Sequence, residues 1–257
     1  MPHYLLNSLE VAQYQRDGFV IVRGLFERDE MLKLLSHAKG DEALTQSVYG
    51  RKDSSGQVTK LALQNEAGDD LYGMFARSPR MLDRVEQLLG EEVYLWHSKM
   101  MLKEPLVGGA WEWHQDYGYW YFDGCLTPDL LSVLISIDHA HKANGCLQVI
   151  RGSHLIGRID HGKTGDQSGA DLSRVQQALD RMELVWCECE PGDAIFFHSN
   201  VLHRSDQNTS PNARWSLICC YNTKSNSPLT VRKHPRYTPL DRVTDDAIRA
   251  WQPLHHS

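Results

Sequence analysis

From residue 92 onward, the sequence is a series of short apolar runs separated by turn-forming residues. Asn144-Gly145 and Pro191-Gly192-Asp193 are the clearest of the turns. The runs that we expect to form strands are 93–102, 130–137, 146–150, 184–189, 194–197 and 214–221. Because a chain with many short strands closes into a barrel or a jelly roll, we expect a mainly β fold with flanking helices.

The first ninety residues favour helices instead. Helices are expected over 8–17, over a segment that contains Met31 and ends at Gly40, and over 79–89. One β-branched run, 19–22, is expected to form a strand. Residues 41–60 are polar and predict a loop or a mobile flap, and a polar insertion at 160–170 precedes another expected helix.

The length of 257 residues fits one domain of an all-β class. We expect a single domain over 1–257 in three parts. These are a helical buttress, mostly 1–90, a jelly-roll core of about 91–225, and a C-terminal extension, 226–257.

Composition narrows the possible partners and the compartment. A net charge of −6 without any Lys/Arg-rich block makes a nucleic acid or a membrane an unexpected partner. No apolar run approaches the roughly 20 residues that cross a bilayer, and the first residues lack the layout of a secretory signal. The six cysteines show no CxxC spacing, so we expect buried, reduced thiols and a cytoplasmic protein.

The densest chemical signal is the segment 111–117, Trp-Glu-Trp-His-Gln-Asp-Tyr. In an extended segment, His114 and Asp116 point to the same side, as two ligands of one metal must. Such a pair alone is as typical of a hydrogen-bonded surface pair. A third ligand is available in His198 or His203, which lie at and beyond the end of an apolar strand.

Two histidines and one carboxylate leave positions open on a metal, which suits non-haem Fe(II) and O₂ activation. A structural zinc site would use thiolates, although a catalytic zinc with these ligands stays possible. Arg214 opens an apolar strand and therefore needs a carboxylate or a phosphate for bidentate pairing. A dicarboxylic acid cosubstrate would provide that carboxylate.

Together these residues resemble a known family. The motifs are His114-x-Asp116, His203-x-Ser205, Arg214, Asn144-Gly145-Cys146-Leu147 and Gly152-Ser153-His154. Over about 9–222, the chain is similar to the phytanoyl-CoA dioxygenase family of Fe(II)/2-oxoglutarate oxygenases, which includes ectoine hydroxylase. The resemblance implies a double-stranded β-helix, a cupin-like jelly roll. It also implies that His114, Asp116 and His203 ligate iron and that Arg214 and Ser205 hold the distal carboxylate of 2-oxoglutarate.

The resemblance extends to further cosubstrate contacts. It places Lys99 and His97 on the strand that precedes the ligands, and it places Lys60 at the spacing of an upstream lysine that relatives use. For Lys60 a solvated lysine is the alternative. His203 is preferred to His198 as the third ligand because only His203 is followed by the family's serine and arginine at the expected spacings.

The resemblance also implies the reaction. Iron, O₂ and 2-oxoglutarate, with ascorbate as the reductant in vitro, hydroxylate an unactivated C–H and release succinate and CO₂. Tyr117, Tyr119 and Trp120 are the candidate substrate contacts, with core packing as the alternative. Aromatic rings near carboxylates favour a small amine-bearing or amino-acid-like metabolite over an acyl-CoA.

Several matters stay open at this stage. A metal-binding cupin-like protein or a zinc hydrolase without O₂ chemistry is one alternative, and a peptide or protein hydroxylase is another. A halogenase is disfavoured because Asp116 occupies the position where a halide would bind. The sequence indicates neither the substrate's identity nor the oligomeric state.

Overall fold

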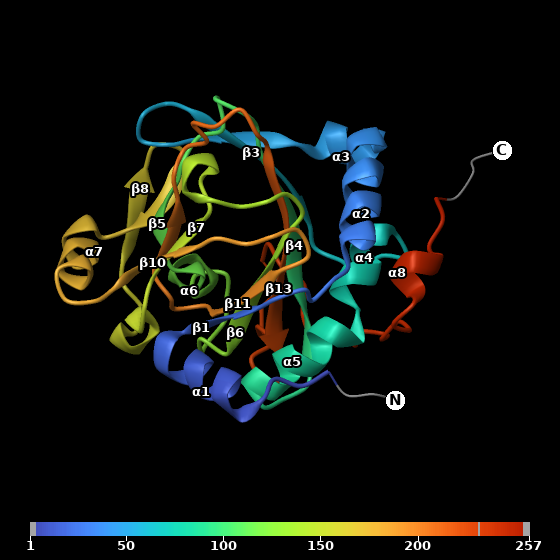
Figure 1. Ribbon diagram of the computed structural model, residues 1–257. Helices are drawn as coiled ribbons and strands as arrows, with labels where there is room; N and C mark the ends of the chain where they lie inside the picture. The colour runs from blue at the N-terminus through green and yellow to red at the C-terminus, as the bar shows by residue number, and fades with distance from the viewer. Residues whose placement is uncertain (1–3, 231, 254–257) are drawn as a thin grey trace.

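The computed structural model describes residues 4–230 and 232–253, and in it two β-sheets face each other (Figure 1). The larger sheet has seven strands in the order β1 (Phe19–Val22), β11 (Ala194–His198), β6 (Leu130–Ser136), β13 (Arg214–Thr223), β4 (Val93–Lys103), β3 (Val58–Gln64) and β2 (Tyr49–Lys52). The smaller sheet has the order β10 (Leu184–Cys187), β7 (Leu147–Ile150), β12 (His203–Ser205) and β5 (Trp111–His114). The mainly β, double-stranded β-helix class predicted from the sequence is therefore confirmed.

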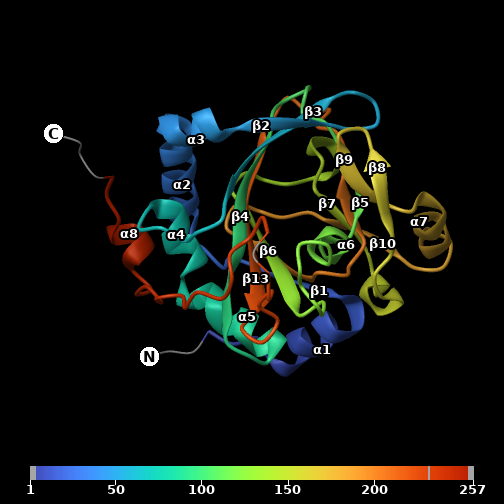
Figure 2. The same cartoon turned by 180° about the vertical axis from the view of Figure 1, so that it is seen from behind.

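Helices cover the outer face of the larger sheet (Figure 2). They are α2 (Arg28–Gly40), α4 (Leu71–Ala76), α5 (Pro79–Leu89) and α8 (Ala247–Ala250). The other helices are α1 (Ser8–Asp17), α3 (Glu42–Ser47), α6 (Asp116–Trp120) and α7 (Leu172–Leu179), with short 3₁₀ turns at Lys142–Asn144 and Ser153–Ile156.

The central strands are buried on both faces, which explains their continuous apolar runs. Every residue of β6 and β13 is buried. Along β13, Leu217 and Cys219 pack with the helices, whereas Ile218 and Cys220 pack in the core between the sheets. A strand sandwiched in this way has no polar face to alternate with.

The expectation of a loop or flap over 41–60 is wrong. The segment forms α3, β2 and the start of β3, and the β2–β3 hairpin extends the edge of the large sheet. The carboxylate of Asp53 organises the turn by accepting hydrogen bonds from the backbone amides of Ser55 and Gln57. The polar composition of this segment reflects an exposed edge rather than irregular structure, since all four residues of β2 are exposed.

Other departures are smaller. The polar insertion at 160–170 contains a hairpin, β8 (His161–Thr164) and β9 (Gln167–Ala170). The N-cap of α1 is Asn7, whose side chain accepts from the amide of Glu10, and Ser8 is the first helical residue.

All six cysteines are buried and free, as expected from their spacing. Over the described ranges, none of the helices combines the length and the apolar character that a bilayer crossing requires.

Candidate metal and cosubstrate site

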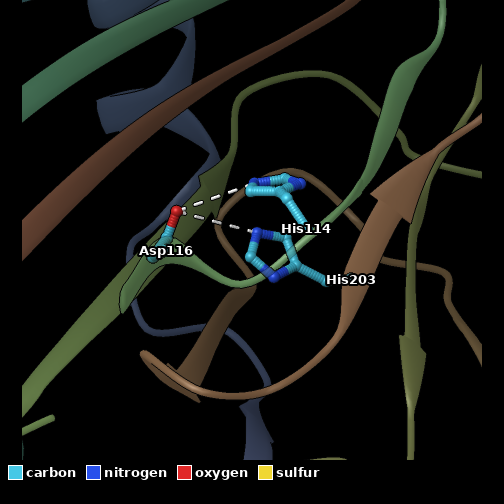
Figure 3. A group of neighbouring side chains, drawn as sticks. All are labelled: His114, Asp116 and His203. Carbon is cyan, nitrogen blue, oxygen red and sulfur yellow. Dashed lines mark ion pairs between the residues drawn. The ribbon is translucent and has the colours of Figure 1, made fainter. Parts of the chain in front are cut away.

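Neighbouring strands of the smaller sheet bring two histidines together. β12 and β5 are antiparallel, and His203 lies directly opposite His114 in their register. Asp116 comes next to them because Gln115, which joins β5 to α6, is still extended. In Figure 3 the carboxylate of Asp116 points at both rings, with Oδ1 at 3.6 Å from Nε2 of His114 and 3.9 Å from Nε2 of His203. Ligand atoms of all three side chains lie within 4.8 Å of one another.

Backbone carbonyls fix the orientation of both imidazoles. Nδ1 of His114 lies 2.8 Å from the carbonyl oxygen of Glu112, and Nδ1 of His203 lies 2.9 Å from that of Val201. Since a carbonyl can only accept, each Nδ1–H donates and each Nε2 lone pair faces the carboxylate. Burial, together with the neighbouring His114, lowers the pKa of His203 to about 3. Two imidazole nitrogens and a carboxylate facing one another form a donor set that fits a divalent iron ion.

The carboxylate of Asp116 is ionised and held by two hydroxyl groups. Burial alone would raise its pKa, but the nearby Lys99 ammonium opposes burial, and the pKa lies well below its ordinary value. Tyr119 donates to Oδ1 at 3.0 Å, and Ser132 donates to Oδ2 at 2.7 Å. Ser132 escaped the sequence analysis because a serine inside a buried strand carries no motif.

The histidines line an inner cavity together with the predicted anchor residues. Lys99, Ser205 and Arg214 contribute to its wall, and Leu134, Phe197 and Ile218 supply apolar surface. The Arg214 guanidinium is buried and has no carboxylate partner in the described part of the chain. One of its nitrogens donates weakly to Ser216 at 3.3 Å, and Nε has no partner. A buried, unpaired guanidinium is costly unless an anion neutralises it, so the cavity fits a carboxylate-bearing cosubstrate.

A buried lysine that the sequence analysis missed supports Ser205. Nζ of Lys103 donates to the Ser205 hydroxyl at 2.9 Å, and Lys103 is 1% exposed. Lys103 lies opposite Arg214 in the register of β13 and β4. This pairing becomes visible only when the two strands are aligned, so no local motif could have indicated it.

A second, outer pocket of about 440 Å³ adjoins the inner cavity. Lys99 and Trp111 line both, so the two spaces are neighbours. Tyr119 and Trp120, two of the three predicted substrate contacts, line the outer pocket. The third, Tyr117, does not, because it is buried in the core and donates to the carbonyl of Leu126 at 2.7 Å.

The structure separates the remaining predicted cosubstrate residues from the inner cavity. His97 lies in the outer pocket, where its ring stacks on His234 at a centroid distance of 4.9 Å. Nδ1 of His97 is buried without a hydrogen-bond partner. Lys60 is exposed on β3, and neither cavity includes it.

The outer pocket carries charges of both signs. Arg51, Lys99 and Lys233 provide cations, and Asp123 and Asp166 provide carboxylates. Arg51 comes from β2 and Lys233 from the C-terminal segment, which the sequence analysis did not connect with the site. The basic charge at this mouth is therefore greater than the sequence analysis expected.

His198 lies apart from the three potential ligands. Its Nδ1 accepts a hydrogen bond from the amide of Asn200 at 3.0 Å, and its ring lies 5.3 Å from that of His154. Burial lowers its pKa to about 4. Among the described residues, His203 rather than His198 joins His114 and Asp116.

Comparison with known proteins assigns the chain to a family. The family model described as phytanoyl-CoA dioxygenase matches residues 14–216, which contain both histidines, Asp116, Ser205 and Arg214. The chain belongs to the phytanoyl-CoA dioxygenase family. Its similar relatives include an ectoine dioxygenase of Bordetella parapertussis, 26% identical over 266 residues that cover 97% of this chain and 86% of that protein. An L-proline trans-4-hydroxylase of Streptomyces griseoviridis is 28% identical over 247 residues, covering 89% of this chain and 90% of that protein.

Solved structures of similar proteins share this fold. EctD from S. alaskensis with 2-oxoglutarate and 5-hydroxyectoine superimposes with a TM-score of 0.75 at 25% identity, covering 95% of this chain and 86% of that one. The epimerase SnoN, in complex with Fe³⁺, alpha ketoglutarate and nogalamycin RO, gives a TM-score of 0.72 at 21% identity, covering 93% of this chain and 96% of that one.

Proposed function

We propose that the protein is an Fe(II)/2-oxoglutarate-dependent dioxygenase that hydroxylates an unactivated C–H of a small polar metabolite. One observation carries the proposal. Two imidazole nitrogens and a carboxylate converge at a cavity whose wall also holds Arg214, a buried cation without an anionic partner. A metal and a dicarboxylic acid satisfy both parts of this site at once.

The polar residues at the inner cavity divide into iron ligands and a cosubstrate anchor in this proposal. His114, Asp116 and His203 would hold Fe(II), and Arg214 with the Ser205 hydroxyl would bind the distal carboxylate of 2-oxoglutarate. Bound iron supplies the activation of O₂, coupled to decarboxylation of 2-oxoglutarate to succinate and CO₂. The apolar side chains between these groups exclude water from the reacting centre.

The outer pocket supports a small zwitterionic substrate such as an amino acid. Its volume of about 440 Å³ suits a metabolite. Lys99, which lines both cavities, would bind a substrate carboxylate, and Asp166, which has no ion-pair partner among the described residues, would bind an ammonium group. The relatives named for ectoine and L-proline also act on small molecules of this class.

The C-terminal extension belongs to the same functional unit in this proposal. Lys233 and His234 line the outer pocket, and His234 lies 3.6 Å from the carboxylate of Asp123. A single domain over 1–257 follows, since the extension completes the site. The six free thiols favour the reducing cytoplasm as the compartment.

Succinate formation provides the test. The iron-loaded protein, with 2-oxoglutarate and ascorbate, should release succinate slowly by itself and faster with members of a panel of small amino acids and cyclic amines, each of which gains one oxygen. A matched panel of acyl-CoA thioesters is the comparison. Stimulation by acyl-CoAs alone would refute the substrate class, and failure to bind 2-oxoglutarate anaerobically would refute the reaction.

A further inference from the structure

Lys103 is a lysine sealed in the protein interior without a counter-ion. Lys103 is 1% exposed, and among the described residues Nζ donates only to the Ser205 hydroxyl, at 2.9 Å, and to the backbone carbonyl of Asp206. In the described ranges no carboxylate forms an ion pair with it. Burying an ammonium group in this way is costly unless an anion compensates it or the group loses its proton.

The charges around Lys103 do not provide that compensation. Arg214 lies opposite Lys103 on β13 and repels its charge. The nearby carboxylates are engaged elsewhere: Asp206 binds Arg204 and Gln148, and Asp53 binds the turn of the β2–β3 hairpin and the amide of Ala110. The remaining titratable neighbour is the buried thiol of Cys146.

We propose that Lys103 is the positioning residue of the cosubstrate anchor, acting through the Ser205 hydroxyl, and that it takes up one proton from solvent when 2-oxoglutarate binds. This inference rests on the proposed function. Lys–NH₂ and a solvent proton give Lys–NH₃⁺, and the distal carboxylate supplies the negative charge that the paired cations lack.

The hydrogen bonds explain how Lys103 would act on the ligand. Since the Ser205 oxygen accepts from Nζ, its own hydrogen is free to donate into the cavity, where a carboxylate needs a donor. The carbonyl of Asp206 holds Nζ from the other side. Lys103 therefore sets the direction of the serine hydroxyl without itself lining the cavity.

The expected pH dependence has a defined sign. Burial, and after it the charge of Arg214, holds the pKa of Lys103 well below its ordinary value in the free protein. A bound carboxylate raises that pKa again. At pH values between the pKa of Lys103 in the free protein and its pKa in the complex, the complex holds one more proton than the free protein. The affinity for 2-oxoglutarate therefore falls as pH rises, by up to about tenfold per pH unit.

Isothermal titration of 2-oxoglutarate into the Fe(II)-loaded protein under argon tests the inference without turnover. The observed enthalpy, measured over a range of pH in buffers of different ionisation enthalpy, should reveal net proton uptake at pH values between the pKa of Lys103 in the free protein and that in the complex. Lys103→Met should abolish the uptake and weaken binding about tenfold while Fe(II) affinity is unchanged. Lys163→Met, which replaces an exposed lysine of β8, is the matched control and should retain the wild-type uptake.

Each possible result either supports the inference or overturns it. Absence of proton uptake in the wild type, or equal uptake in Lys103→Met, would overturn the inference and leave the oxygenase assignment standing. Absence of 2-oxoglutarate binding would overturn both. If Lys103→Met does not fold, the wild-type buffer dependence and Ser205→Ala decide, because Ser205→Ala should weaken binding about tenfold by removing the hydroxyl that links Lys103 to the ligand.

Discussion

His203 lies directly opposite His114 across the β12–β5 ladder, with ring centroids 4.0 Å apart. Sheet register therefore sets the distance between the two candidate ligands before any metal binds. A slip of one residue would turn the His203 ring to the other face of the strand. The irregularity in this ladder falls between His203 and Ser205 and leaves the histidine pair aligned.

The first prediction separates the two candidate histidines. His203→Ala should abolish Fe(II) binding, because it removes one of three converging donors. His198→Ala should retain the metal, since His198 hydrogen-bonds Asn200 and packs against His154 instead. Iron content after anaerobic loading and desalting measures both. Equal loss of iron in the two variants would contradict the assignment.

The second prediction concerns the cosubstrate anchor. Arg214→Ala should weaken 2-oxoglutarate binding by about 2–5 kcal/mol, the range for truncating one partner of a buried charge pair, and leave Fe(II) affinity nearly intact. Arg181→Ala, at an exposed position after α7, is the control and should bind normally. Anaerobic titration calorimetry provides both affinities. An unchanged affinity for 2-oxoglutarate would place the distal carboxylate elsewhere.

The sequence predicted the strands of the core better than the pocket that they carry. Runs such as 130–137 and 214–221 are apolar throughout because both of their faces are buried, so they could be located without knowing their partners. Asp116 was expected to continue the extended segment of His114. It is instead the first residue of α6, because the extended conformation ends at Gln115.

The missed residues share a physical cause. Lys103 reaches the site because its strand pairs with that of Arg214. Arg51 and His234 reach it because distant parts of the chain fold back beside the outer pocket. No local sequence pattern encodes either. Lys60 had a plausible spacing, but strand alternation turns it outward while its neighbour Leu61 faces the outer pocket.

The third prediction uses two tyrosines of α6 as a matched pair. Tyr119→Phe removes the hydroxyl that donates to Oδ1 of Asp116 at 3.0 Å, and should lower Fe(II) affinity about 10-fold or more, as losing a partner of a ligand does. Tyr117→Phe removes a hydroxyl that donates to Leu126 and should leave Fe(II) affinity unchanged. An anaerobic Fe(II) titration, monitored by tryptophan fluorescence, gives the Fe(II) affinity of each variant. Equal affinities would show that the Tyr119 hydroxyl does not orient the carboxylate.

The last prediction concerns stability in acid. Burial lowers the pKa of His198 from 6.5 to about 4, so between these pH values the unfolded chain binds a proton that the folded protein excludes. The free energy of unfolding therefore falls as pH drops through this window, and His198 accounts for about 2 kcal/mol of loss between pH 7 and pH 5. The glutamine of His198→Gln can still accept a hydrogen bond from the Asn200 amide but cannot titrate. In urea unfolding, this variant should therefore lose about 2 kcal/mol less of its free energy of unfolding between pH 7 and pH 5 than the wild type. His139→Gln, at an exposed position, should lose as much stability as the wild type. A His198→Gln profile parallel to the wild type would mean that the imidazole stays solvated in the folded protein.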